Sequence, residues 1–328
     1  MTRPHSPAPS PTIKAVLVTM FEPSDSRPGE LSRFREHYRL QPVAVPGLDD
    51  GQVLTNGQGL LALVAGVGPV NTATSVLTLG LSDAFDLRQA GWLICGIAGI
   101  NPHEATLGSA VWADWVVDGD LGFELDARDM PDDWETGILP LGARQPYGES
   151  PPAGGAFGHP YQVFQLERSL VDWASKLTAG IKLADNDALR QERERFTTGS
   201  TAHQAPGVMR GDNLSAARFW HGPRFNTWAE RWVKHWTAGE GTFVTSGMED
   251  TGTLHALRQL DRLGRASFSK ALLLRTGSNF TMPPPGVDLM ENLTGHDGEG
   301  EANYPGLEAA LDSGLRCGRV VIDAMLAQ

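Results

Sequence analysis

The sequence predicts an α/β protein of three layers, α/β/α, with a mixed sheet at its centre. Short, almost continuous apolar segments such as residues 13–20 recur along the chain, which is the pattern of strands buried on both faces. Segments with apolar residues at helical spacing, such as 72–85, lie between them. Several apolar segments also end in glycine-rich or polar turns. Strands that alternate with helices in this way pack as a sheet covered by helices on both faces.

The first half of the chain holds four of the predicted strands. They are short and apolar, and glycine-rich turns follow the second and the third of them. We expect strands at 13–20, 60–65, 91–95 and 110–117, and helices at 29–39 and 72–85.

An irregular segment at 127–160 interrupts this alternation. It holds six prolines and six glycines with little periodicity, so we interpret it as an insertion or a lid-like loop. Strands and helices resume after it and continue to the end of the chain. We expect helices at 163–178, 185–195, 248–263 and 307–326, strands at 207–212, 242–245 and 271–276, and a loop at 281–304.

Composition and charge argue against several classes of protein. The net charge is −12, from 27 basic and 39 acidic residues, and no basic stripe suited to nucleic acid is visible. The two cysteines, Cys95 and Cys317, cannot form a disulfide framework, and their spacing does not fit zinc. We therefore expect no nucleic-acid partner and no metal site.

The N-terminal residues 1–12 are rich in proline and serine and are expected to be disordered. They lack the apolar segment of a signal peptide, and no later stretch approaches the roughly 18 apolar residues of a membrane span. We expect residues 13–328 to form a single domain with no membrane insertion. A cytoplasmic location follows, with a periplasmic one as the alternative.

Polar or glycine-rich turns follow four of the predicted strands. They are Ala65–Gly68, Gly96–Gly99, Arg210–Asp212 and Arg275–Asn279. In α/β sheets, ligands collect where strands end and loops meet the first turns of helices. Each turn alone is more consistent with tight packing of a strand against a helix than with a ligand site, and the first lacks the third glycine of a dinucleotide fingerprint.

The order of these turns is more specific than any one of them. Together with the pair Met248–Glu249, they resemble the active-site core of the nucleoside phosphorylase and nucleosidase superfamily, over about residues 13–328. The segments 210–222, 245–253 and 274–286 are similar to the purine nucleoside permease family. The resemblance implies a nucleoside phosphorylase-like fold, cleavage of the N-ribosidic bond of a purine nucleoside, and a homo-oligomer of two or more subunits.

The resemblance assigns roles to five residues in the last third of the chain. Glu249 would accept hydrogen bonds from the 2′ and 3′ hydroxyls of the ribose, and Met248 would pack on its face. The alternative for Glu249 is a charge that stabilises the start of a helix. Asn279 would bond to N7 of the purine, oriented by Ser278, and asparagine here implies a preference for 6-oxopurine nucleosides such as inosine and guanosine. Arg275 would bind phosphate or position the nucleophile.

The resemblance also predicts the residues around the base. Leu214 and Ser215 match the loop that covers the base in nucleosidases, and Ala98 and Gly99 lie in the turn that follows the third strand. Phe219 is a candidate for stacking on the base, although an aromatic residue there is as often plain packing.

The loop after the first strand should decide the nucleophile. It holds Glu22, which could activate water, and Arg27 with Ser24, which could bind phosphate together with the turn of Gly66 and Gly68. Phosphorolysis is slightly favoured, with inorganic phosphate as a possible co-substrate and no other cofactor. A hydrolytic nucleosidase and a non-catalytic nucleoside-binding protein for uptake are the alternatives.

Overall fold

The computed structural model describes residues 11–23, 27–147, 161–294 and 303–328. The tail predicted at 1–12 lies outside the described residues except for its last two, of which Thr12 pairs with Asp86. The second part of the insertion predicted at 127–160 also lies outside them.

Most of the described strands join one large sheet of mixed direction. In chain order its strands are β1 (Ala15–Thr19), β2 (Gln41–Ala44), β3 (Gln52–Thr55), β4 (Leu60–Val64), β5 (Gly91–Ile100), β6 (Ala110–Trp112), β7 (Trp115–Asp118), β10 (Val163–Gln165), β11 (Val208–Arg210), β12 (Asp212–Ser215), β13 (Phe243–Gly247) and β14 (Ala271–Phe280). The strands β1, β4, β5 and β14 run parallel to their neighbours within this group, whereas β13 is antiparallel to β5. Two short strands, β8 (Phe123–Glu124) and β9 (Ile138–Leu139), pair separately, so the start of the predicted insertion forms a small hairpin.

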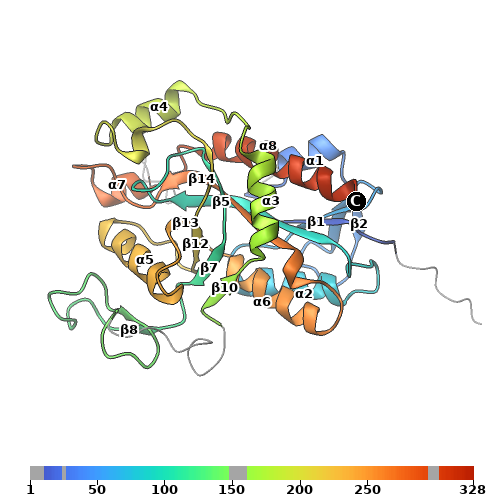
Figure 1. Ribbon diagram of the computed structural model, residues 1–328, viewed down its shortest axis with the longest axis horizontal. Helices are drawn as coiled ribbons and strands as arrows, with labels where there is room; N and C mark the ends of the chain where they lie inside the picture. The colour runs from blue at the N-terminus through green and yellow to red at the C-terminus, as the bar shows by residue number, and fades with distance from the viewer. Residues whose placement is uncertain (1–10, 24–26, 148–160, 295–302) are drawn as a thin grey trace, which may run out of the picture.

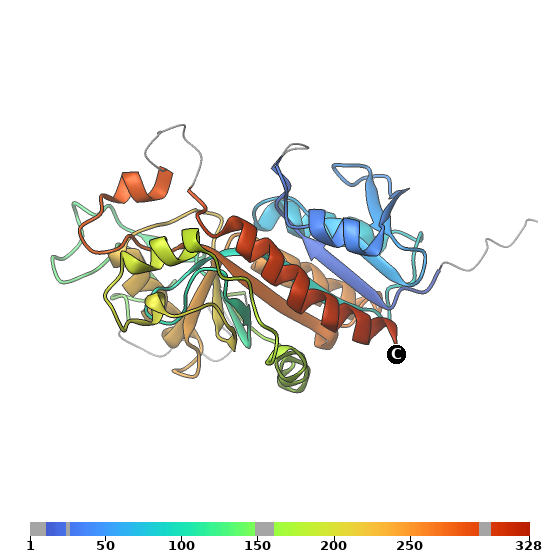
Figure 2. The ribbon, with the colours of Figure 1, turned by 90° about the horizontal axis from the view of Figure 1, so that it is seen from above.

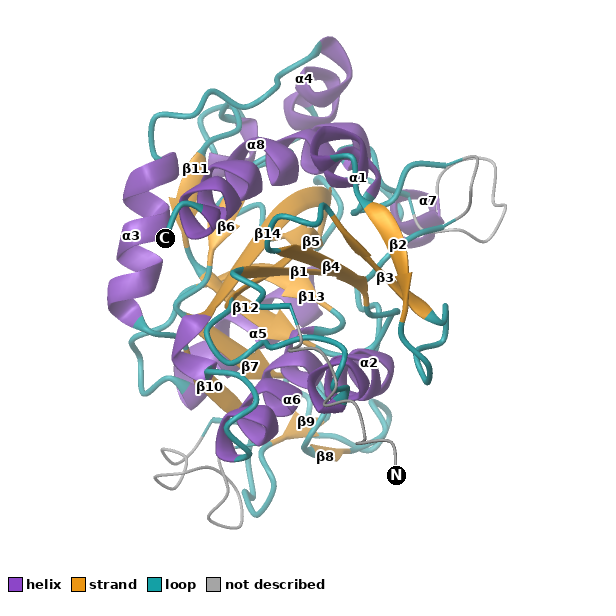
Figure 3. Ribbon diagram, turned by 90° about the vertical axis from the view of Figure 1, so that its right-hand side faces the viewer, coloured by secondary structure: helices purple, strands orange, loops and turns teal. Residues whose placement is uncertain are grey.

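Helices cover both faces of the sheet, as predicted for three layers (Figure 1). They are α1 (Ser32–Tyr38), α2 (Pro69–Leu81), α3 (Arg168–Thr178), α4 (Asp187–Glu194), α5 (Pro223–Trp236), α6 (Asp250–Arg262), α7 (Leu289–Thr294) and α8 (Leu307–Leu326). Figure 3 shows α1, α3 and α8 on one side of the strands and α2, α5 and α6 on the other. The long helix α8 lies along β14 (Figure 2). The predicted fold class, α/β with a central mixed sheet, is therefore confirmed.

The two longest strands, β5 and β14, continue beyond their predicted ends. They pair in parallel from Trp92 opposite Ala271 to Ile100 opposite Phe280, and every residue of β14 is buried. The glycine-rich and polar turns predicted after these strands are thus the last residues of the strands themselves. Their side chains are held by the sheet, which gives them more precise positions than a loop would.

Other differences concern elements that local periodicity did not predict. Helix α5 was not expected, although Trp228, Trp232 and Trp236 recur every four residues and are buried against the sheet. The strand β10 occupies the start of a segment predicted to be helical, because it pairs antiparallel with β7. The strands β2 and β3 and the helix α7 were not predicted either.

Candidate functional site

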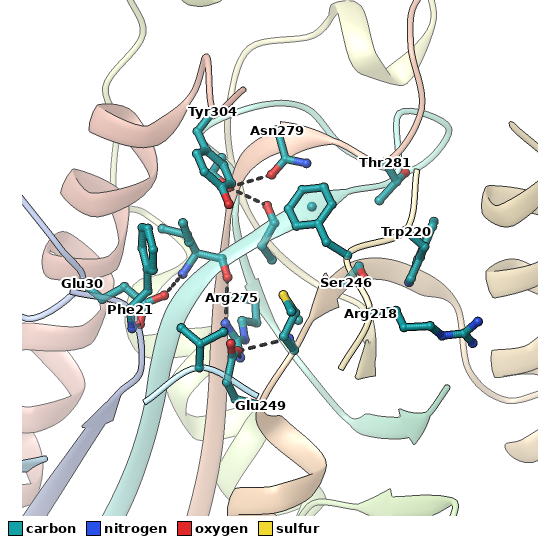
Figure 4. Close-up of a pocket in the computed structure, with 18 residues that line it drawn as sticks. Phe21, Glu30, Arg218, Trp220, Ser246, Glu249, Arg275, Asn279, Thr281 and Tyr304 are labelled. Carbon is teal, nitrogen blue, oxygen red and sulfur yellow. Dashed lines mark hydrogen bonds and ion pairs between the residues drawn. The ribbon is translucent and has the colours of Figure 1, made fainter. Parts of the chain in front are cut away.

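A cavity lies at the edge of the sheet where the parallel strands β1, β4, β5 and β14 end. Because parallel strands end on the same side, the residues that follow them gather there. Ser246 of β13 pairs with Gly99 of β5, which brings the segment after β13 to the same place. The cavity (Figure 4) is lined by Phe21, Glu30, Val67, Ile97, Ala98, Gly99, Arg218, Phe219, Trp220, Ser246, Gly247, Met248, Glu249, Arg275, Ser278, Asn279, Thr281 and Tyr304.

Many of the residues predicted from the sequence meet in this cavity. They come from three distant parts of the chain, and a further one, Phe219, comes from the loop before α5. The predicted site residues that line it are Ala98, Gly99, Phe219, Met248, Glu249, Arg275, Ser278 and Asn279.

Leu214 and Ser215, which were predicted to contact the base, do not lie at the cavity. Both lie in β12 and are fully buried, and neither lines the cavity. Leu214 packs in a hydrophobic cluster with Trp228, and the hydroxyl of Ser215 accepts a hydrogen bond from the backbone N–H of Thr251 at 3.2 Å. The strand continues through these residues, so the cavity wall is made by the loop that follows it.

Glu22 lies outside the cavity and stabilises the start of α1 instead. Its Oε1 accepts a hydrogen bond from the backbone N–H of Leu31 at 2.5 Å, and its Oε2 accepts one from the hydroxyl of Ser32 at 3.4 Å. The carboxylate is thus bound to the first turn of a helix, where negative charge is favoured. It is not positioned to activate water in the cavity.

The predicted phosphate ligands also fall outside the lining of the cavity. Gly66 and Gly68 have φ of 84° and 89°, so they shape the turn into α2, and only Val67 between them reaches the cavity. Arg27 is exposed and does not line the cavity. Ser24 lies outside the described residues.

The carboxylate that does reach the cavity from this loop is Glu30. It accepts hydrogen bonds from three backbone N–H groups: Met20 at 2.7 Å and Phe21 at 3.1 Å to Oε2, and Ile97 at 2.8 Å to Oε1. Burial raises the pKa of Glu30 to about 7, against the opposing effect of the Arg275 guanidinium. The sequence analysis missed this residue because it appeared to be an ordinary charge at the start of the helix predicted at 29–39.

Arg275 connects the carboxylates on the floor of the cavity. Its Nη2 donates to Glu249 at 2.8 Å and to Asp250 at 2.7 Å, its Nε donates to Asp250 at 3.1 Å, and its Nη1 donates to the carbonyl of Ile97 at 2.7 Å. Burial by itself would lower the pKa of Arg275, but the carboxylates of Asp250, Glu249 and Glu30 raise it above its usual value. At least four of its five N–H donors are therefore used within the protein.

Glu249 keeps one oxygen for a ligand. Its Oε2 accepts hydrogen bonds from Arg275 and from the backbone N–H of Met248 at 3.1 Å. Both contacts involve the same oxygen, and within the described residues Oε1 has no hydrogen-bond partner, so it is available in the cavity wall. This is the geometry expected of a carboxylate that receives hydroxyl groups.

The opposite end of the cavity is neutral. The hydroxyl of Ser278 lies 2.9 Å from Oδ1 of Asn279 and 3.1 Å from the carbonyl of Ala98, and its single hydrogen is shared between these two acceptors. The pairing of β14 with β5 shifts by one residue at Ser278, so that Asn279 lies opposite Gly99. This bulge turns the Asn279 side chain into the cavity, as bulges often do beside active sites.

Aromatic side chains close the remaining wall. The ring of Tyr304 lies 6.2 Å from the rings of both Phe219 and Phe21, measured between centroids. Trp220 packs edge-on against Trp228 and belongs to the cluster beneath α5. Flat apolar surfaces of this kind suit a planar base.

Comparison with known protein families shows to which family the chain belongs. The model of the purine nucleoside permease family matches residues 12–328. The chain belongs to this family.

Two curated members of the family illustrate the similarity. A purine nucleoside permease of Candida albicans is 26% identical over 256 residues, which are 76% of this chain and 62% of that protein. The matched region thus spans less than two thirds of the relative. A probable purine nucleoside permease of Schizosaccharomyces pombe is 29% identical over 293 residues, which are 86% of this chain and 83% of the relative.

Solved structures with the same fold include enzymes of nucleoside cleavage. A 5′-methylthioadenosine/S-adenosylhomocysteine nucleosidase from Neisseria meningitidis superposes with a TM-score of 0.53 at 16% identity, over 95% of this chain and 99% of that one. The futalosine hydrolase of Helicobacter pylori gives 0.54 at 13% identity, over 96% and 98%. At these identities the comparison establishes the fold of this family member.

In the part of the chain that the structure describes, no helix has both the length and the apolar character needed to cross a bilayer.

Proposed function

We propose that this family member hydrolyses the N-ribosidic bond of purine nucleosides, with Glu30 as the general base that activates water. The observation that carries the proposal is the buried carboxylate of Glu30 in the cavity wall, with a pKa of about 7. A base with a pKa near the working pH combines a substantial ionised fraction with useful basicity. Hydrolases and nucleosidases of the same fold support this choice of chemistry.

The ionic floor of the cavity suits the charge that develops during cleavage. As the C1′–N9 bond breaks, positive charge builds on the ribose and negative charge on the base. Glu249, through Oε1, would hold the ribose hydroxyls beside Met248, and the carboxylates would stabilise the positive sugar. The water oxygen bonds to C1′ as the C1′–N9 bond breaks, and one water proton passes to Glu30. Asn279 donates a hydrogen bond to N7 of the leaving base, which takes up a proton from solvent water, and Glu30 returns its proton to solvent.

Hydrolysis is preferred to the phosphorolysis that the first loop suggested. A phosphate nucleophile needs cationic or N–H donors in the cavity, and Arg275 gives at least four of its donors to Asp250, Glu249 and Ile97. The negative charge of Glu30 and Glu249 would also repel a phosphate dianion. The experiment below therefore tests whether inorganic phosphate is a co-substrate.

A second candidate is a nucleoside-binding protein for uptake, because the curated relatives are named permeases. Such a protein needs the ribose and base contacts but no general base. The assembly of subunits expected from the resemblance would be compatible with either function.

The test is chromatography of adenosine, inosine and guanosine after incubation with the purified protein, with and without phosphate. We expect free base and ribose at the same rate in both conditions. Glu30→Gln should lower turnover by about 10²- to 10⁴-fold, the usual contribution of a general base. The matched control, Glu22→Gln, makes the same change in the same loop outside the cavity. The glutamine oxygen can still accept from the N–H of Leu31 and touches no substrate, so activity should stay within about threefold.

Ribose 1-phosphate formed only in the presence of phosphate would show that the reaction is phosphorolysis and not hydrolysis. Nucleoside binding without any cleavage would support the uptake function. An equal loss of activity in both variants would show that Glu30 is not the general base.

A further inference from the structure

Thr281 and Asn279 border the same space at the neutral end of the cavity. A Cβ atom built on Gly99 would lie 3.1 Å from Cγ2 of Thr281 and 3.5 Å from Nδ2 of Asn279. Glycine at position 99 therefore leaves open a space that both side chains flank. In Figure 4 the amide nitrogen of Asn279 points away from the Tyr304 side of the cavity and toward the side where Thr281 lies.

A chain of polar groups leads to Thr281 from Glu230, which is partly exposed, through the buried amides of Asn101 and Asn226. Oε1 of Glu230 accepts hydrogen bonds from Nδ2 of Asn101 at 3.0 Å and from Nδ2 of Asn226 at 3.1 Å, and it lies 2.8 Å from Nδ1 of His103. A carboxylate can only accept hydrogen bonds. Both amides must therefore turn their NH₂ groups toward Glu230. Asn101 confirms this orientation, because its Nδ2 also donates to the carbonyl of Phe243 at 3.1 Å.

The orientation of Asn226 then determines that of Thr281. Nδ2 of Asn226 also donates to Oδ1 of Asn101 at 3.1 Å, so both of its hydrogens are used. Its Oδ1 faces the hydroxyl of Thr281 at 2.6 Å and can only accept. The other neighbour of that hydroxyl, the carbonyl of Ile100 at 3.2 Å, is also an acceptor. The single hydroxyl hydrogen of Thr281 is thus committed inside the protein, so Thr281 has no hydrogen to donate to a ligand, and its hydroxyl oxygen can only accept.

Asn279 is fixed in the opposite sense. Its Oδ1 accepts from Ser278, and its Nδ2 donates one hydrogen to the carbonyl of Phe280 at 3.3 Å. The second hydrogen of Nδ2 has no acceptor within the described part of the chain and is available to a ligand. The cavity therefore presents a donor, Asn279, beside an acceptor, Thr281.

A purine with an amino group at C6 has the complementary pattern on one edge, since N7 accepts and the amino group donates. A 6-oxopurine has two adjacent acceptors there, N7 and O6, and O6 would meet the lone pairs of Thr281. We propose that Thr281, held as an acceptor by Asn226 and Glu230, is a specificity-determining residue that selects 6-aminopurine over 6-oxopurine nucleosides. The proposal rests on the nucleoside site described under the proposed function. It opposes the 6-oxopurine preference that the resemblance implies for Asn279.

The experiment measures the affinity of free adenine and hypoxanthine by titration calorimetry, which requires no turnover. The wild-type protein should bind adenine about tenfold more tightly, the effect expected of one hydrogen bond gained and one repulsive contact avoided. Thr281→Val keeps the shape and removes the acceptor, so adenine affinity should fall about tenfold and the preference should disappear. Thr281→Ser restores the hydroxyl and should recover the preference.

The matched control is Thr227→Val, the same substitution next to Asn226 on α5, where the hydroxyl donates to the carbonyl of Pro223 outside the cavity. It should leave the ratio of the two affinities unchanged. Asn226→Ala removes the acceptor that holds the Thr281 hydroxyl and should reduce the adenine preference while both bases still bind. A structural role for Asn226 would instead weaken both bases equally.

Tighter binding of hypoxanthine to the wild type, an unchanged ratio in Thr281→Val, or failure of both bases to bind would overturn the proposal. Selective adenine binding without nucleoside cleavage would leave it standing and reject only the proposed hydrolysis.

Discussion

The two ends of the cavity are built from different kinds of interaction. At one end, Arg275 joins the carboxylates of Glu249 and Asp250 beneath Glu30, so that charge is concentrated where a sugar cation would form. At the other end, Asn279 and Thr281 are neutral, and their partners determine which atoms donate and which accept. The charged end is suited to stabilising a transition state, and the neutral end is suited to recognising one base among several.

The largest expected effect is a loss of stability caused by a substitution at the charged end of the cavity. Arg275→Met removes the cation and leaves the buried carboxylates of Glu249 and Asp250 without their partner. We expect a loss of about 3–5 kcal/mol in the free energy of unfolding, the usual result of removing one member of a buried ion pair. Urea denaturation at pH 7 measures it. A loss below about 1 kcal/mol, the range of exposed pairs, would mean that the floor of the cavity is open to solvent.

The next prediction concerns pH. Because the pKa of Glu30 is raised from 4.5 to about 7 by burial, the folded protein favours the protonated form. Its contribution to stability is complete below about pH 4.5 and is lost as the pH rises through about 7. The fall in unfolding free energy between pH 5 and pH 8 should be larger in the wild type than in Glu30→Gln, by about 3 kcal/mol at most. Equal slopes in the two proteins would place the pKa of Glu30 in its ordinary range. Comparison with the variant is needed because burial also raises the pKa of Asp118 and Asp212 to about 6.

The smallest expected effect is a loss of base affinity caused by a substitution at the neutral end of the cavity. Ser278→Ala removes the hydroxyl that donates to Oδ1 of Asn279 and allows the amide to turn over. Base affinity should fall by about two- to tenfold, the value of one neutral hydrogen bond, while stability changes little. Titration with adenine measures the first and thermal unfolding the second. A variant that loses stability but keeps its affinity would show that Ser278 serves only to close the bulge in β14.

The sequence predicted part of each end of the cavity and missed one lining residue at each, Glu30 at the charged end and Thr281 at the neutral end. Ser278 and Asn279 lie at the end of an apolar strand whose character is visible locally, and Met248–Glu249 follows another. Glu30 could not be found in this way. Its role depends on the backbone N–H of Ile97, 67 residues away, which only the pairing of β1 with β5 brings near. Thr281 and Asn226 were missed for the same reason, since their hydrogen bond joins a strand end to the unpredicted helix α5.

Two errors have a common physical cause. Leu214 and Ser215 were predicted to be loop residues, and the turns after β5 and β14 were predicted to end those strands. In each case pairing with a neighbouring strand extended the sheet through polar or glycine residues whose local propensity favours a turn. The context of the sheet outweighed the preference of the single residue.

Trp220 and three tryptophans of α5 form a row of neighbouring indole rings, which provides an intrinsic spectroscopic probe of the cavity. Trp220 in the cavity wall lies 5.8 Å from Trp228, which lies 5.7 Å from Trp232, which in turn lies 5.8 Å from Trp236, measured between ring centroids. Rings this close couple their electronic transitions, so a base that contacts Trp220 should alter the near-ultraviolet circular dichroism of the whole row. Occupancy of the cavity can therefore be read from the native chain without an attached dye.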